Sequence, residues 1–199
     1  MTLPALINAQ QLKAALSELK PLLIVDLSSA ENYAAGHIVH SDHVLPSQLS
    51  SGIAPATGSL PSLEKLSALL SAIGFDGTQH VVAFDDAGGS WAGRFIWTLT
   101  LLGFEKTSLV DGGRNAVLKE GIALTSAISP IKASAPLALS IDPQCIADKN
   151  AILAGIGKKD FAVWDARSPE EYAGSKVLAA RGGHIPGAIN IEWTQLMDS

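Results

Sequence analysis

The sequence reads LIVDLSSAENY at residues 23–33, and the same pattern returns as AVWDARSPEEY at residues 162–172. In both stretches a short apolar run ends in an aspartate. A Gly-His-Ile triplet follows each stretch, at residues 36–38 and 183–185. The offset grows from 139 at the aspartates to 147 at the histidines, so the second copy carries eight additional residues. A self-match of this kind indicates a duplicated domain rather than a short solenoid repeat.

Short β-branched runs alternate with amphipathic stretches along the first copy. This alternation predicts an α/β domain with a mostly parallel sheet. Strands are predicted at residues 22–25, 80–84 and 107–110, and helices from Asn8 to near Lys20-Pro21, from Pro61 to Gly74, from Ser90 to Leu102, and up to Gly121. Aspartates and glycines follow the strand ends, which is where α/β sheets place their sites.

The composition excludes several classes of protein. The 199 residues are 47% hydrophobic, which is enough for one large or two small cores, and the net charge of −5 gives no basic patch for nucleic acid. The apolar runs are far shorter than the about 20 residues that cross a bilayer. Residues 1–4 carry no positive segment of a signal peptide. We therefore expect a soluble cytoplasmic protein without nucleic-acid or membrane partners.

Residues 126–138 differ in character from both copies. They contain small residues and two prolines without periodicity, which is typical of a linker. The sequence therefore predicts a complete domain at residues 1–125, a linker at residues 126–138, and the N-terminal half of a second domain at residues 139–199.

Three motifs occur in a fixed order. The first motif is a strand ending in aspartate at residues 163–172, followed by a Gly-His-Ile-Pro-Gly-Ala stretch at residues 183–190. The second is a strand that enters a loop at residues 81–85, and the third is an Asp-Gly-Gly turn at residues 109–113. Together these motifs resemble the rhodanese family over nearly the whole chain. The resemblance implies a rhodanese-like three-layer α/β domain with a central, mostly parallel sheet, duplicated, the second copy being incomplete.

The resemblance to tandem rhodanese-type sulfurtransferases also implies a chemistry. In that family a cysteine begins a loop whose backbone N–H groups stabilise a thiolate and its persulfide. Sulfur moves from an anionic donor, thiosulfate or 3-mercaptopyruvate, to a thiol or cyanide acceptor in two covalent steps. This mechanism requires neither a cofactor nor a metal.

The cysteine position of the first copy holds Asp85, and a carboxylate cannot form a persulfide. The matching position of the second copy falls near residue 232, beyond Ser199, so roughly 70 residues of that copy are expected to be absent. No catalytic residue is therefore expected in this chain, which alone should be inactive. The missing half is a possible partner, as a bound fragment of the same polypeptide. The alternative is a non-catalytic rhodanese-like module used for binding or regulation.

Cys145 is the only cysteine, which excludes an intramolecular disulfide and a four-cysteine zinc site. It lies in residues 142–147, which look like the first turn of the second copy's leading helix; residues 8–12 occupy the equivalent place in the first copy. We expect a half-buried packing role for Cys145, because this end of the fold is far from the cleft. No Cys-x5-Arg loop follows it, so a phosphatase of the related fold is discarded.

Arg167 and Arg181 are the candidate substrate-binding residues. Arg167 follows the strand-end Asp165 by two residues, and the resemblance implies that the arginine of such an Asp-x-Arg motif contacts the donor anion. A guanidinium matches sulfonate or carboxylate oxygens. Arg181 lies in the eight-residue insertion and resembles a second donor-binding arginine. The alternative for Arg167 is an ion pair with Glu170 or Glu171.

The histidines have structural interpretations. His37 and His184 each belong to a Gly-His-Ile turn, where a bond to nearby backbone is expected. The spacing of His37, His40 and His43 suggests a metal site, but strand or turn geometry would splay these side chains, so we expect no metal.

The remaining polar residues have structural interpretations as well. Asp85 and Asp86 are expected to cap the helix at Ser90, since no further carboxylate cluster supports a metal or phosphotransfer site. Asp26 and Asp165 are expected to accept N–H groups of the loops that follow them.

The Gly112-Gly113 pair is expected to supply a turn with positive φ before the last helix. The four tryptophans are Trp91, Trp97, Trp164 and Trp193. Most of them are expected to pack in the core, and Trp193 is a candidate neighbour of the cleft.

Overall fold

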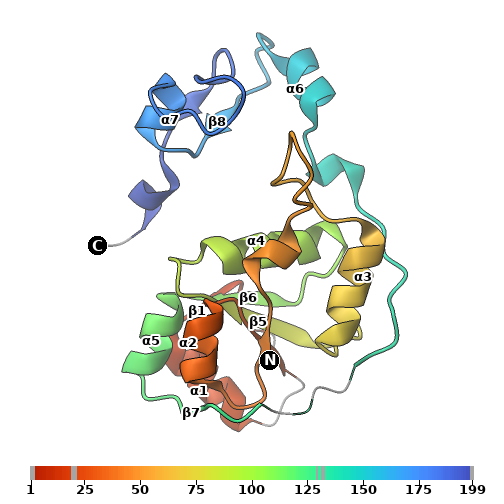
Figure 1. Cartoon of the computed structure of the whole chain (residues 1–199), viewed down its shortest axis with the longest axis vertical. Coiled ribbons are helices and arrows are strands. Elements are labelled where there is room, and N and C mark those ends of the chain that lie inside the picture. The colour runs from red at the N-terminus through yellow and green to blue at the C-terminus, as the bar shows by residue number, and fades with distance from the viewer. Residues whose placement is uncertain (1–2, 19–21, 129, 131–132, 198–199) are drawn as a thin grey trace. The chain divides into compact units, whose positions relative to one another are not determined.

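The computed structural model of the chain describes residues 3–18, 22–128, 130 and 133–197 (Figure 1). It divides into two compact units, Met1–Pro143 and Gln144–Ser199, each described here by itself. The predicted end of the first helix near Lys20-Pro21 lies outside the described residues, as do residues 1–2 and 198–199 and three positions of the predicted linker. The domain boundaries predicted at residues 125 and 138 stay predictions.

A five-stranded sheet forms the centre of the first unit, in the order β1-β6-β5-β2-β4. Every neighbouring pair of strands is parallel, which confirms the predicted α/β fold with a mostly parallel central sheet. The strands are β1 (Leu6–Ile7), β2 (Leu22–Asp26), β4 (Asp42–His43), β5 (His80–Phe84) and β6 (Thr107–Val110). Asp26 pairs with Phe84, so β2 and β5 end together at one edge of the sheet.

Helices cover both faces of this sheet (Figure 1). They are α1 (Ala9–Ser17), α2 (Ala30–Ala35), α3 (Leu63–Ala72), α4 (Ser90–Leu101) and α5 (Gly113–Lys119), with a 3-10 turn η1 at Pro46–Leu49. The Asn8 side chain accepts the Gln11 N–H at 2.8 Å and caps α1 as predicted. Helix α3 begins two residues after the predicted Pro61, because the side chain of Ser62 provides its cap.

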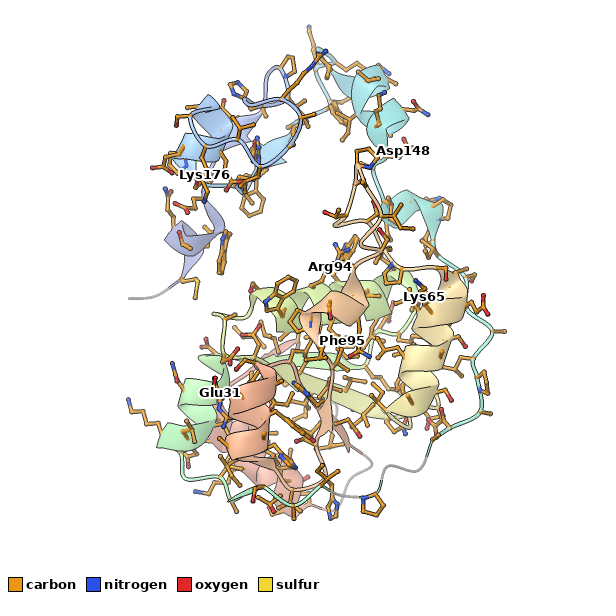
Figure 2. The ribbon with its side chains drawn as sticks, in the orientation of Figure 1. Glu31, Lys65, Arg94, Phe95, Asp148 and Lys176 are labelled. Atoms are coloured by element: carbon orange, nitrogen blue, oxygen red, sulfur yellow. The ribbon has the colours of Figure 1, made fainter. Side chains whose placement is uncertain are left out.

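The alternation of strand residues divides the core between the two faces. Val25 and Ala83 belong to the apolar cluster under α3 and α4, where Phe95 of α4 packs (Figure 2). Ile24 and Val82, their neighbours in sequence, belong to the cluster under α1 and α5. Successive side chains of a strand point to opposite faces, so a run that is apolar throughout predicts a strand buried on both sides.

The segment after the first sheet, part of the predicted linker, packs along α3. The Ser67 and Ser71 hydroxyls of α3 donate to the carbonyls of Leu137 and Ser134, at 2.8 and 2.5 Å. Leu137, Leu139 and Ile141 pack against the cluster under α3 and α4. The absence of periodicity therefore reflects an extended segment that is bound to the first unit.

The second unit contains fewer elements and little buried apolar surface. Its elements are η2 (Pro143–Cys145), α6 (Lys149–Gly155), β8 (Trp164–Asp165), α7 (Pro169–Ala173), β9 (Ile189–Asn190) and η3 (Trp193–Leu196). Within the described part of the chain β8 pairs only with β9, in parallel. Ala188 is the only buried apolar side chain of this unit among the described residues.

The leading helix of the second unit begins later than the sequence predicts. Its cap is Asp148, whose side chain accepts the Ala151 N–H at 2.8 Å (Figure 2). Asp148 is thus the counterpart of Asn8, and Cys145 lies in a separate 3-10 turn before the helix. Cys145 is exposed. Cys145 was predicted to be half-buried in the first helical turn, and this prediction is wrong. The helix starts at its cap Asp148, three positions after Cys145.

None of the helices in the described ranges is long and apolar enough to span a membrane.

Candidate active-site loop and its counterpart in the second repeat

The carboxyl end of β5 leads into a loop that surrounds the Asp85 side chain. Oδ1 of Asp85 accepts the N–H groups of Ala87 and Gly89 at 2.9 and 2.8 Å. Oδ2 accepts those of Trp91 and Ala92, both at 2.9 Å. Asp85 is 1% exposed, so these four N–H groups and the start of α4 hold a buried anion. The predicted capping of this helix by Asp85 is confirmed.

Asp86 does not cap α4, and that prediction is wrong. Its Oδ2 accepts the backbone N–H and hydroxyl of Ser29, each at 2.9 Å, and the Asn32 amide at 2.6 Å. Asp86 therefore joins the loop after β5 to the first turn of α2. The Asp85 carboxylate already accepts the N–H groups at the start of α4, so Asp86 bonds to α2 instead.

The Asp-Gly-Gly turn packs against the backbone of the same loop. The Arg114 N–H donates to the Asp85 carbonyl at 2.8 Å. Gly112 and Gly113 have φ of 72° and 51°, which confirms the predicted positive-φ turn. A Cβ on Gly113 would lie 2.4 Å from the Asp85 carbonyl oxygen, so glycine is required there.

Arg114 is a buried residue of this region that sequence reasoning did not single out. Its Nη2 donates to the carbonyls of Asn32 and Gly36, at 2.8 and 2.6 Å, and its Nη1 lies 3.6 Å from Asp26 Oδ2. Burial raises the pKa of Asp26, although Ser28 and Arg114 oppose this shift. A signal was present, because an arginine in the first turn of a helix opposes the helix dipole and must have another use.

Asp26 accepts the Ser28 N–H at 2.8 Å through Oδ1, which confirms its predicted role of anchoring the loop after β2. Beside it, the Tyr33 ring is stacked between His37 and His43, with ring centroids 4.0 and 4.3 Å away. His37 Nδ1 lies 3.0 Å from the Tyr33 carbonyl, so the predicted structural role of this histidine is confirmed.

The second repeat forms the same contacts with its own residues. The Tyr172 and His184 rings stack at 3.7 Å, and His184 Nδ1 lies 2.8 Å from the Tyr172 carbonyl. The hydroxyls of Tyr33 and Tyr172 donate to equivalent carbonyls, those of Ser41 and Ala188, both at 2.8 Å. The duplication seen in the sequence thus extends to individual hydrogen bonds.

The structure places Arg167 against the strand-end aspartate. Its Nε and Nη2 donate to Asp165 at 2.9 and 2.6 Å, and Nη2 also donates to the Gly183 carbonyl at 2.9 Å. These bonds lower the pKa of Asp165 and raise that of Arg167. The ion pair of Arg167 is therefore with Asp165, and the alternative pair with Glu170 or Glu171 is not formed.

Asp165 also accepts the Arg167 N–H at 3.1 Å, as predicted for a strand-end anchor. Arg181 is exposed, and the part of the chain that the structure describes offers it no hydrogen bond or ion pair. Within the described ranges the structure therefore does not join the two candidate arginines through hydrogen bonds or ion pairs.

The tryptophans are not core residues, contrary to the prediction. Their exposed fractions run from 37% to 55%, for Trp91, Trp97, Trp193 and Trp164. Trp97 instead lies under the guanidinium of Arg94, 4.6 Å from its ring centroid. Within the described ranges no cluster of three or more His, Cys, Asp or Glu side chains is arranged to hold a metal ion.

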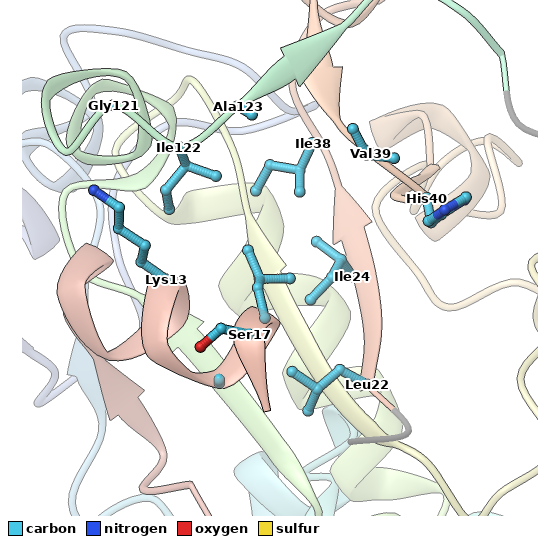
Figure 3. Close-up of a pocket in the computed structure, with 12 residues that line it drawn as sticks. Lys13, Ser17, Leu22, Ile24, Ile38, Val39, His40, Gly121, Ile122 and Ala123 are labelled. Carbon is cyan, nitrogen blue, oxygen red and sulfur yellow. The ribbon is translucent and has the colours of Figure 1, made fainter. Parts of the chain in front are cut away.

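A pocket of about 660 Å³ lies on the α1 and α5 side of the sheet (Figure 3). Ile24, Ile38 and Ile122 form its apolar wall, and Lys13 and His40 lie among its polar lining residues. Asp26 and Asp85 are not part of this lining. The pocket is therefore separate from the loop at the carboxyl edge of the sheet.

Comparisons with known proteins identify the class of this fold and loop. The family model described as "Rhodanese-like domain" matches residues 8–120 and 148–199, more than half of the chain. The chain belongs to the rhodanese family, and curated relatives with which it aligns are named as sulfurtransferases.

Among curated relatives, a thiosulfate sulfurtransferase of Azotobacter vinelandii is 44% identical over 99% of this chain and 72% of its own length. A thiosulfate sulfurtransferase of Pseudomonas aeruginosa is 44% identical over 89% and 65%. A 3-mercaptopyruvate sulfurtransferase of Rattus norvegicus is 28% identical over 98% and 71%. The chain thus spans about two thirds to three quarters of these relatives' lengths.

Solved structures agree on the fold. SseA from Escherichia coli, described as a 3-mercaptopyruvate sulfotransferase with the rhodanese fold, has a TM-score of 0.87 at 23% identity, over 99% of this chain and 78% of its own. A 3-mercaptopyruvate sulfurtransferase from Leishmania major has a TM-score of 0.80 at 21% identity, over 96% and 55%.

Replacing Asp85 by alanine should lower the free energy of unfolding by about 2–4 kcal/mol, because four backbone N–H groups around this buried carboxylate lose their acceptor. Chemical denaturation followed by tryptophan fluorescence measures this loss. Asp111→Ala is the matched control, since Asp111 also follows a strand but is exposed, and it should stay within about 0.5 kcal/mol. Equal losses in the two variants would contradict the role given to Asp85.

Burial raises the pKa of Asp42 from 3.8 to about 6, so its carboxyl binds a proton more tightly in the folded than in the unfolded chain. The contribution of Asp42 to stability should therefore fall as the pH rises from about 4 to about 6, by about 2–3 kcal/mol at most, and stay constant above. Asp42→Asn should remove this component. Denaturation at pH 4.5 and pH 7.5 checks it, and an identical pH dependence in parent and variant would contradict it.

Proposed function

We propose that this chain is part of a cytoplasmic enzyme that moves sulfane sulfur from thiosulfate or 3-mercaptopyruvate to a thiophilic acceptor. The sulfur is carried as a persulfide on a cysteine of the second repeat, in polypeptide that follows residue 199. The names of the curated relatives support the donor class. The observation that carries the assignment to the second repeat is Asp85, which occupies the loop of the first.

The proposed reaction has two displacements. The cysteine thiolate attacks the sulfane sulfur of thiosulfate, the S–S bond of the donor breaks, and sulfite leaves with its electron pair. The acceptor, a thiol or cyanide, then attacks the outer sulfur of the persulfide. With cyanide the products are thiocyanate and the regenerated thiolate.

The loop geometry of the first repeat supports this mechanism. There the N–H groups of four residues surround a buried anion, the Asp85 carboxylate. A thiolate in the same position of the second repeat would receive the same stabilisation. The offset of 147 that separates His37 from His184 puts that position near residue 232.

The exposed apolar side chains of the second unit support a continuation of the polypeptide. Trp164, Ile191 and Leu196 are 55%, 42% and 64% exposed. Their counterparts in the first repeat are Val25, Val44 and Leu49, all fully buried under α3 and α4. We propose that the segment with the cysteine covers this face of the second unit, either as continuous chain or as a bound fragment.

Arg167 and Arg181 are proposed to bind the anionic donor. Arg167 is paired with Asp165 and has no counterpart in the first repeat, where the position holds Ser28. Arg181 is exposed in the insertion that only the second repeat carries. Both residues thus belong to the repeat to which the cysteine is assigned.

A non-catalytic module for binding or regulation is the second candidate. Asp85 favours it, because the first repeat has the complete fold and lacks a nucleophile.

The two functions differ in what the complete gene product does. Under the first, it forms thiocyanate from thiosulfate and cyanide, and a cysteine follows a β-branched strand near residue 232. Cys145→Ser should leave this activity unchanged, because Cys145 lies in an exposed turn outside the loop. Absence of thiosulfate and 3-mercaptopyruvate turnover in the complete product would favour the binding module.

In the complete gene product, Arg167→Ala and Arg181→Ala should each raise the donor KM by roughly tenfold with a smaller change in kcat, because a charge-assisted contact to the donor is lost. Steady-state kinetics with thiosulfate measure both constants. Lys158→Ala, which removes an exposed cation of the same unit, is the control and should leave the KM unchanged. An unchanged KM in an arginine variant removes that arginine from the site.

A further inference from the structure

The turn that carries Arg167 is fixed through both its side chain and its backbone. Asp165 binds the guanidinium along the edge formed by Nε and Nη2. The Asn190 amide of β9 donates to the carbonyls of Asp165 and Arg167, at 2.9 and 2.8 Å. Residues 165–167 are therefore held from the side of the aspartate and from the neighbouring strand.

In the first repeat the turn is fixed through its backbone but carries no arginine that the aspartate could bind. His43, the counterpart of Asn190 in the strand register, places Nε2 2.8 Å from the Ser28 carbonyl and so fixes the same backbone position. Ser28 has no charge to orient, and Asp26 is paired with Arg114 of a distant helix. The backbone contact is thus common to both repeats, whereas the Asp–Arg fork within the turn belongs to the second.

The hydrogen bonds leave one part of the guanidinium available. Asp165 and the Gly183 carbonyl engage Nε and Nη2. Within the described ranges Nη1 donates no hydrogen bond, and the Arg167 side chain is 44% exposed. A guanidinium held along one edge presents its remaining N–H groups in a fixed direction, which lowers the entropic cost of binding an anion.

We propose that Asp165 and Asn190 are positioning residues for Arg167, which hold its Nη1 group in place for the anionic sulfur donor. This inference rests on the proposed donor-binding role of Arg167. It assigns to Asp165 and Asn190 an effect on donor affinity that acts through the arginine.

The test uses the ¹⁵N-labelled complete gene product and its arginine side-chain N–H signals. Arg167→Lys identifies the Arg167 signal by its loss. Titration with thiosulfate at constant ionic strength, set with chloride, should shift this signal in the parent. Asn190→Ala and Asp165→Asn should each weaken thiosulfate binding roughly fivefold. Asn190→His, which introduces the residue of the first repeat, should stay within about twofold of the parent because it can bind the same carbonyl.

The outcomes separate the two proposals. If thiosulfate does not shift the Arg167 signal of the parent, the donor-binding role of Arg167 is rejected and this inference with it. If the parent binds and the Asn190→Ala and Asp165→Asn variants bind equally well, only the positioning role is rejected. If Asp165→Asn does not fold, the two Asn190 variants decide. Weaker thiosulfate binding by Asn190→Ala with parent-like binding by Asn190→His supports the positioning role. Equal binding by both variants rejects it.

Discussion

Backbone N–H groups at the start of a helix have no intrahelical acceptor, and in the first repeat the Asp85 carboxylate accepts them. The surrounding architecture depends on this contact. The parallel strand β5 delivers Asp85 to the edge of the sheet, the loop curls around its side chain, and Gly113 allows the next turn to approach its carbonyl. A loop built around an anion is also what persulfide chemistry requires, and this is the geometry that we propose for the corresponding loop of the second repeat.

The two repeats meet one requirement with different arginines. In each copy one arginine side chain contacts two groups. These are the aspartate at the end of the strand and the carbonyl of the glycine in the Gly-His-Ile turn. Arg114 supplies it from α5 in the first, with 2.6 Å to the Gly36 carbonyl. Arg167 supplies it from the adjacent turn in the second, with 2.9 Å to Gly183. Sequence alignment alone would pair Arg167 with Ser28 and miss this equivalence.

The sequence predicted the parallel sheet, its long strands and the main helices, because buried strands and capped amphipathic helices have strong local patterns. It did not predict strands such as β3 (His37–Ile38), which pairs with β7 (Leu124–Thr125), because two residues carry no period. The partners of Asp86 and Arg114 depend on contacts across more than 50 residues of sequence. The exposed tryptophans were misjudged because large aromatic residues resemble core residues when only hydrophobicity is considered.

In the described part of the chain β8 pairs with β9 alone, and this has a consequence for handling the protein. β8 contains the exposed Trp164, and among the described residues its second edge has no partner strand; such an edge can accept a strand from another molecule. In the first repeat the matching edge is closed by β5. Concentrated solutions of the 199-residue chain should therefore self-associate through this half of the molecule, and a longer polypeptide that closes the edge should remain dispersed.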